Sequence, residues 1–187
     1  MKTLAIFILI IGIGTSSCSA QKKIASIDNN VTLKADLENY TVKKQQKKAT
    51  IENTKNKLGS VRQVSPNLPI NISLRPYYIK LDLQQLTKIL AINIPLKELE
   101  SLASNKNAGI SIDLRTELTG RVLEVSFFTD ENSILNLKQL ELIESEIKEA
   151  KLVTVKPEIE KYIRGSNFLL VDTRIVFEDI LKAKKTM

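Results

Sequence analysis

The sequence predicts an α+β fold: a small antiparallel sheet covered on one face by one long helix and preceded by a polar, basic tether. Apolar and polar residues alternate in several segments between residues 66 and 177, which is the pattern of half-buried strands. Residues 137–150 instead repeat their apolar side chains with the period of a helix. We therefore expect a signal peptide at 1–20, the tether at 21–65 and the α+β domain at 66–187.

The first 20 residues have the three parts of a bacterial signal peptide. Lys2 supplies a positive charge, residues 4–13 form an uncharged apolar run, and small residues follow up to Ala20. The apolar run is shorter than the roughly 20 residues that cross a bilayer, and no later segment is longer. We expect export to the periplasm or outer membrane of a Gram-negative bacterium, without a membrane-spanning helix.

Two cleavage sites compete within this segment. Residues 15–18 resemble the lipobox of bacterial lipoproteins, in which small residues precede a cysteine that is acylated, although Thr15 departs from the usual aliphatic residue. The resemblance implies lipid attachment at Cys18, and an anchor with several acyl chains holds a protein stably on a membrane. The alternative is ordinary cleavage after Ala20, which would release a soluble, secreted protein.

The composition argues against the commonest catalytic designs. The chain has no histidine, which excludes imidazole bases, imidazole metal ligands and nucleophiles activated by histidine. No paired-carboxylate or calcium-loop spacing stands out among the remaining polar residues. Because Cys18 is the only cysteine, packing must hold the fold together without disulfides. We expect a non-enzymatic protein with no catalytic residues, no metal site and no cofactor.

The basic excess is concentrated near the N-terminus. Residues 21–60 hold nine lysines against four acidic residues, so they carry +5 of the formal net charge of +7. Anionic lipid headgroups or cell-wall polymer would suit this tract in an exported chain, whereas nucleic acid is not an expected partner. The alternative is a solvated, self-repelling spacer. Apolar residues are sparse up to residue 65, which is why we interpret this part as a tether.

The domain is expected to begin with two short strands and a helix. Apolar residues alternate with polar ones at 70–74 and 79–83, on either side of Pro76, which favours strands beside a bend or at an edge. A helix then begins at Pro95 and ends before Gly109, because proline suits a first helical turn and glycine a C-terminal cap.

A hairpin and the clearest helix of the chain follow. Gly120 lies between two alternating segments, and glycine adopts without strain the positive φ that a tight turn requires. The helix at 137–150 is preceded by Asn136, which forms the pattern of a capping box with Gln139. We interpret the acidic side of this helix as a solvated face.

The last expected element is a strand from Phe168 to Phe177, preceded by a turn or short helix between Pro157 and Gly165. Successive side chains of a strand point to opposite faces. One parity is mostly apolar, whereas Asp172 and Arg174 occupy the other. We therefore expect the apolar set to face the core: Leu169, Val171, Thr173, Ile175 and Phe177.

The order of these signals resembles the C-terminal domain of TonB and its relatives over roughly residues 92–181. The shared features are a helix that starts at a proline, a glycine before an alternating strand, a glycine hairpin, a packed helix, a proline before the last strand and an aromatic residue at its end. On this chain the punctuating residues are Pro95, Gly109, Gly120, Pro157 and Phe177.

The resemblance implies a protein-binding function. In the TonB family the last strand offers a free edge to an extended peptide of the partner, which is β-augmentation. The implied partner is an unidentified envelope protein, and the implied edge residues are Phe168, Leu170, Asp172, Thr173, Arg174 and Val176. Energy transduction is not expected, because the N-terminal segment is a cleavable signal and the spacer is not proline-rich. The alternative is a small ligand-binding or hydrolytic lipoprotein whose site the sequence does not reveal.

Overall fold

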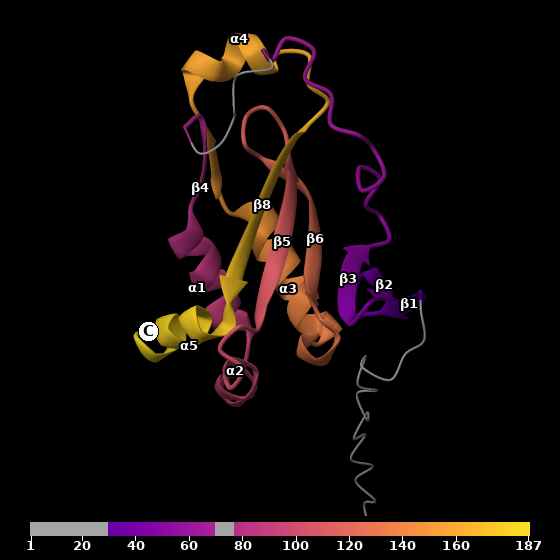
Figure 1. Cartoon of the computed structure of the whole chain (residues 1–187), viewed down its shortest axis with the longest axis vertical. Helices are drawn as coiled ribbons and strands as arrows, with labels where there is room; N and C mark the ends of the chain where they lie inside the picture. Colours follow the sequence, from indigo (N-terminus) through magenta and orange to yellow (C-terminus); the bar gives the residue numbers. More distant parts are fainter. Residues whose placement is uncertain (1–29, 70–76) are drawn as a thin grey trace, which may run out of the picture.

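The computed structural model describes residues 30–69 and 77–187 (Figure 1). Six strands form one sheet in the order β1-β2-β3-β6-β5-β8, and all neighbouring strands are antiparallel. The strands are β1 (Val31–Lys34), β2 (Asn39–Gln45), β3 (Lys48–Asn53), β5 (Gly109–Thr116), β6 (Val122–Asp130) and β8 (Leu169–Val176). Together with the helices, this sheet confirms the predicted α+β class.

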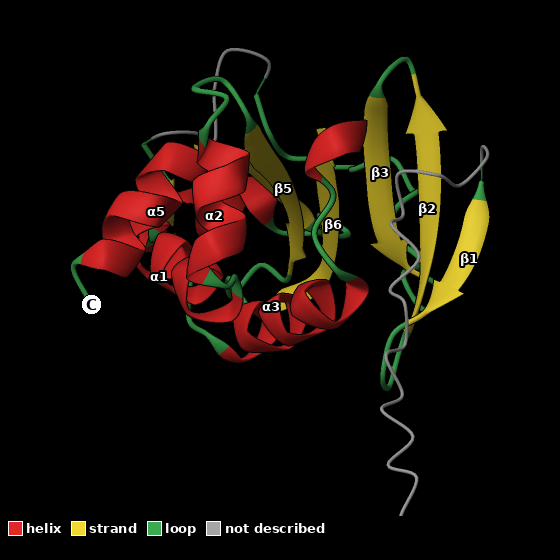
Figure 2. Cartoon of the chain, turned by 90° about the horizontal axis from the view of Figure 1, so that it is seen from below, coloured by secondary structure: helices red, strands yellow, loops and turns green. Residues whose placement is uncertain are grey.

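The helices are α1 (Leu83–Asn93), α2 (Leu96–Ala103), α3 (Leu137–Glu149), α4 (Glu160–Ile163) and α5 (Phe177–Lys185), with the 3-10 turns η2 (Glu131–Ser133) and η3 (Pro157–Ile159). Helices α1, α2, α3 and α5 gather on one face of the sheet (Figure 2), whereas α4 lies beyond the ends of the strands (Figure 1). A separate ribbon pairs β4 (Ile79–Leu81) with β7 (Val153–Val155). The cover therefore contains several helices, whereas the sequence predicted one.

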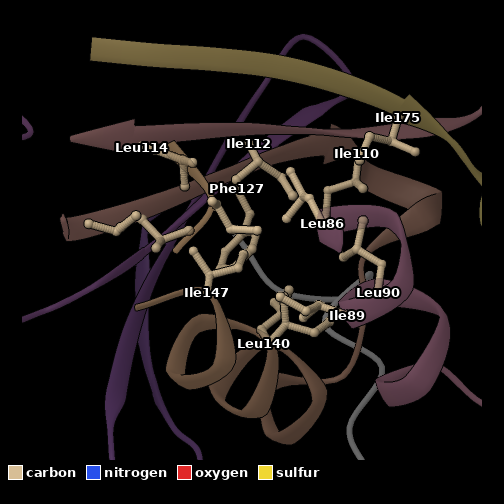
Figure 3. Close-up of a cluster of buried hydrophobic side chains, with 14 of the residues drawn as sticks. Leu86, Ile89, Leu90, Ile110, Ile112, Leu114, Phe127, Leu140, Ile147 and Ile175 are labelled. Carbon is tan, nitrogen blue, oxygen red and sulfur yellow. The ribbon is translucent and has the colours of Figure 1, made fainter. Parts of the chain in front are cut away.

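The main core lies between this helical layer and the sheet. Figure 3 shows Leu86 of α1 and Leu140 and Ile147 of α3 pointing toward Ile112 and Phe127 of the sheet. Leu86, Leu140, Ile147, Ile112 and Phe127 are all fully buried. Burying a large apolar side chain stabilises a fold by roughly 1.5–3 kcal/mol, so this layer holds the sheet in place without disulfides.

The first three strands occupy the part of the chain that was predicted to be a tether. Tyr40, Val42, Ala49 and Ile51 alternate with polar residues and point into the core. The tether prediction is wrong for residues 31–53 because an antiparallel strand needs an apolar residue only at every second position. The low apolar content of this segment therefore did not exclude strands, and the folded part starts well before residue 66.

The segments around Pro76 and Leu83 also differ from the predictions. The strand expected at 70–74 lies outside the described residues. Of the strand expected at 79–83, only Ile79–Leu81 is β4, and α1 begins immediately afterwards. The Asp82 carboxylate accepts a hydrogen bond from the Gln85 amide, which caps this helix.

Several later elements confirm the sequence reading. Helix α2 starts after Pro95 as predicted, but it ends at Ala103 with Ser104 as its C-cap, so Gly109 is not the helix cap and is instead the first residue of β5. Gly120 turns the β5–β6 hairpin at a φ of +89°. Asn136 and Gln139 form both hydrogen bonds of a capping box at the start of α3. Each of these signals is local, so it did not depend on knowing the sheet.

Two further predictions concern the N-terminus. The signal peptide and the acylation site at Cys18 lie outside the described residues. In the part of the chain that the structure describes, no helix is both long and apolar enough to cross a membrane.

Candidate functional site: the edge strand β8

Strand β8 is the last strand of the sheet and pairs with β5 along one side. Its side chains alternate as predicted. Leu169, Val171 and Ile175 are buried against the helical layer, whereas Asp172 and Arg174 are exposed on the opposite face. The Phe177 side chain is also buried, but this residue already belongs to α5. The predicted inward and outward faces are therefore confirmed.

The main-chain groups of β8 alternate in the plane of the sheet. The Leu170 amide donates to Gln63 Oε1 at 3.3 Å, so it points away from β5. The Phe177 amide donates to the Ala108 carbonyl at 3.0 Å, at the start of β5, so it points the other way. Because amide directions alternate along a strand, Arg174 and Val176 share the outward direction of Leu170.

Two residues of the predicted edge do not contribute to it. Phe168 is 2 % exposed and precedes the strand, so its side chain belongs to the interior. The Thr173 amide faces β5 rather than solvent, because it has the parity of Phe177. The prediction fails at Thr173 because the direction of an amide depends on the side of the strand that pairs. The sequence does not contain that information.

A loop lies along the beginning of the edge. The Asn167 side chain accepts from the Val64 amide at 2.9 Å and donates to the Arg62 carbonyl at 3.0 Å. Together with the bond from Leu170 to Gln63, these contacts place residues 62–64 beside the start of β8. At the other end, the Arg174 guanidinium donates to the Asn107 carbonyl at 2.5 Å. The accessible edge therefore lies beyond Leu170.

The face of the sheet opposite the helices carries a polar cluster. Arg115 donates to Ser126 Oγ at 3.1 Å, and Ser126 Oγ donates to Glu52 Oε1 at 3.1 Å. Arg115 is only 8 % exposed, because the loop that contains Gly59 covers it. The Glu124 carboxylate accepts from the amides of Lys57 and Leu58, which fastens the same loop to β6.

A pocket of about 280 Å³ adjoins this cluster. Lys43 Nζ lies 3.5 Å from Glu52 Oε2 inside it, so its two charged groups already satisfy each other. The volume falls just below the roughly 300–1,000 Å³ that is usual for ligand sites. Within the described residues, no group of three or more acidic or cysteine side chains is arranged to hold a metal ion. The lining residues are Thr41, Lys43, Glu52, Asn53, Thr54, Asn56, Gly59 and Ser60.

The acidic side of α3 is buried at Glu141 and Glu144, which contradicts the predicted solvated face at these two positions, whereas Glu149 is exposed as predicted. The Glu141 carboxylate accepts from the amides of Asp36, Leu37 and Glu38 at 2.7–2.9 Å. It is 9 % exposed, and it fixes the turn between β1 and β2. The sequence signal was present, since Glu141 lies four residues after Leu137 and therefore beside the apolar stripe.

Glu144 makes the second contact of this kind. Its carboxylate accepts from the Tyr40 hydroxyl at 2.6 Å and from Lys148 Nζ at 2.6 Å. Burial and the neighbouring carboxylate raise the pKa of Tyr40 far above its usual value, so the phenol stays protonated and donates. Glu144 and Lys148 thus form an ion pair four residues apart on the helix, and Glu144 is only 3 % exposed. Helix α3 therefore holds the N-terminal strands through two carboxylates.

Comparisons with known proteins support the fold. No model of a protein family matches the sequence, and no curated protein matches it either. The crystal structure of a DUF5043 family protein from Bacteroides uniformis is similar, with a TM-score of 0.64 and 16 % sequence identity. The match covers 79 % of this chain and 85 % of that chain. At this identity the likeness concerns the fold alone.

Proposed function

We propose that the protein is a non-enzymatic binding module of the cell envelope, which takes an extended segment of a partner protein onto the β8 edge without transducing energy. The observation that carries this proposal is the position of β8. It ends the sheet, pairs with β5 on one side and directs the amides of Arg174 and Val176 to the other side.

The chemistry of a sheet edge supports this function. An edge strand presents unpaired main-chain donors and acceptors that can template a further strand. A partner strand satisfies them by β-augmentation, and side chains beside the edge add selectivity. The exposed charges of Asp172 and Arg174 would provide that selectivity here. The resemblance to the C-terminal domain of TonB supports the same binding mode.

The proposed location is the periplasm or outer membrane, with the chain attached through acylated Cys18. Strand β1 begins at Val31, so roughly 12 residues would separate the anchor from the sheet. Such a segment spans at most about 40 Å when fully extended. The module would therefore stay close to the membrane, where its lysines can meet anionic headgroups or cell-wall polymer.

A proline substitution at the edge tests this function. Arg174→Pro removes an outward amide without breaking a β5–β8 hydrogen bond, whereas Arg174→Ala removes only the side chain. We expect Arg174→Ala to retain fewer envelope proteins than the mature wild-type protein in an affinity capture, because it loses one of the charges beside the edge, but more than Arg174→Pro. Arg174→Pro should lose most of them while it keeps a native circular dichroism spectrum.

Equal capture by a folded Arg174→Pro variant would refute edge binding. That result would favour the alternative function, a small ligand-binding protein. The polar pocket beside β2, β3 and the following loop lies away from β8, so the substitution would leave it intact.

A further inference from the structure

The exposed part of β8 has nearly the same chemistry when it is followed in either direction from Thr173. Asp172 and Arg174 are opposite charges on either side of this residue. Leu170 lies two residues before Asp172, and Val176 lies two residues after Arg174. Both are on the same face of the strand, and both are apolar. On the core face, Val171 and Ile175 are also both apolar. A strand with this symmetry is complementary to an antiparallel copy of itself.

We propose that the partner on this edge is a second copy of the chain, paired antiparallel along β8 with Thr173 on the two-fold axis. This inference rests on the proposed edge-binding function and names its occupant. In this arrangement Asp172 lies opposite Arg174 of the partner subunit, and the symmetry repeats the pair. Leu170 lies opposite Val176 of the partner subunit. Opposite charges and paired apolar residues both stabilise antiparallel neighbours.

The main-chain geometry agrees with this register. The outward groups belong to even-numbered residues, and the two-fold at Thr173 places even residues opposite even residues. A slip of one residue would place outward groups opposite inward ones. A slip of two residues would place Asp172 opposite Asp172 of the partner subunit, or Arg174 opposite Arg174 of the partner subunit. Charge thus selects one register among those that the hydrogen bonds allow.

The contacts that Leu170 and Arg174 already make affect the outer and central pairs of this register differently. The Arg174 guanidinium has five donors, so it can keep its bond to the Asn107 carbonyl and also meet a carboxylate. Gln63 holds the Leu170 amide, so the outermost pair forms only when that side chain moves aside. The central pair, which the symmetry makes twice, therefore forms without moving Gln63, and it combines main-chain hydrogen bonds with opposite side-chain charges.

A charge exchange tests the pairing in the mature chain that carries Cys18→Ser. Asp172→Arg places arginine opposite arginine, and Arg174→Asp places aspartate opposite aspartate. We expect each variant alone to raise the dimer dissociation constant in sedimentation equilibrium by at least about tenfold. An equimolar mixture of the two should dimerise like wild type, because both cross-strand pairs are then opposite in charge.

A cysteine at the two-fold axis tests the register. On the two-fold axis, Thr173 and its copy form a non-hydrogen-bonded antiparallel pair. The Cα atoms of such a pair lie about 4.5 Å apart, a distance that a disulfide can bridge. We expect Thr173→Cys in the same background to form a disulfide-linked dimer under mild oxidation. Arg174→Cys is the control, because its copies would lie about 8 Å apart on the diagonal, beyond the reach of a disulfide.

Several outcomes would overturn this inference. A wild-type chain that stays monomeric at millimolar concentration would do so, as would a dimer that ignores both charge variants or one in which Arg174→Cys cross-links as readily as Thr173→Cys. If the chain is monomeric but Arg174→Pro still abolishes capture, the proposed function stands and only the second copy as partner is wrong. If neither dimer nor edge-dependent capture exists, both fail.

Discussion

Single carboxylates of α3 fix the N-terminal strands. Glu141 binds three successive amides of the β1–β2 turn, and Glu144 binds the Tyr40 hydroxyl beneath β2. Hydrogen bonds to a charged group contribute about 1.5–3 kcal/mol, and an amide left without its acceptor costs further energy. The apolar stripe of α3 could be found in the sequence. The partners of the flanking glutamates could not, because they lie about a hundred residues earlier.

Removing the Glu141 carboxylate should destabilise the fold. Glu141→Ala leaves three amides without their acceptor, so we expect it to lower the free energy of unfolding in urea by about 2–4 kcal/mol. Glu149 lies on the same helix and is exposed, which makes Glu149→Ala the matched control with an expected loss below about 0.5 kcal/mol. Equal losses from the two substitutions would show that the turn does not depend on Glu141.

The elements differ in how far the sequence reveals them. Helix α3, the Gly120 hairpin and the alternation of β8 are encoded by local patterns, and all three were predicted. The β2–β3 hairpin was missed, because it turns at Gln46 and Lys47 with positive φ, and these residues are not a usual turn pair. For the candidate site, side-chain parity was predictable. The direction of the amides was not, since β5 determines it.

The alternation of β8 predicts that truncating two adjacent leucines destabilises the fold to very different extents. Leu169 is fully buried, whereas Leu170 is 37 % exposed. We expect Leu169→Ala to lower the free energy of unfolding by about 2–5 kcal/mol and Leu170→Ala by less than about 1 kcal/mol. Chemical denaturation of the two variants, which lose the same atoms, measures the difference directly. A larger loss from Leu170→Ala would place the strand in the opposite register.

At the scale of the whole molecule, the first strands belong to the sheet on which the core is built. The order β1-β2-β3-β6 means that removal of residues 30–53 would turn β6 from an interior strand into an edge. It would also remove the buried side chains of Tyr40, Val42 and Ile51. A tether would contribute none of these contacts.

A chain that begins at Val61 should therefore be much less stable than the mature protein. We expect its melting temperature in calorimetry to fall by at least about 10 °C, or its cooperative transition to disappear, because several buried residues are lost together. A chain that begins at Asn30 is the control and should melt within a few degrees of the mature protein. A stable, cooperative fragment from Val61 would restore the tether interpretation.

The central claim is that the outer edge of β8 is the binding surface, and amide hydrogen exchange measured by NMR tests it most directly. In dilute protein, where the edge is empty, we expect the outward amides of Arg174 and Val176 to exchange rapidly and those of Thr173 and Ile175, which face β5, to be protected. When the edge is occupied, at high concentration or with a captured partner, Arg174 and Val176 should become protected as well. Unchanged rapid exchange of both amides in the bound state would contradict the claim.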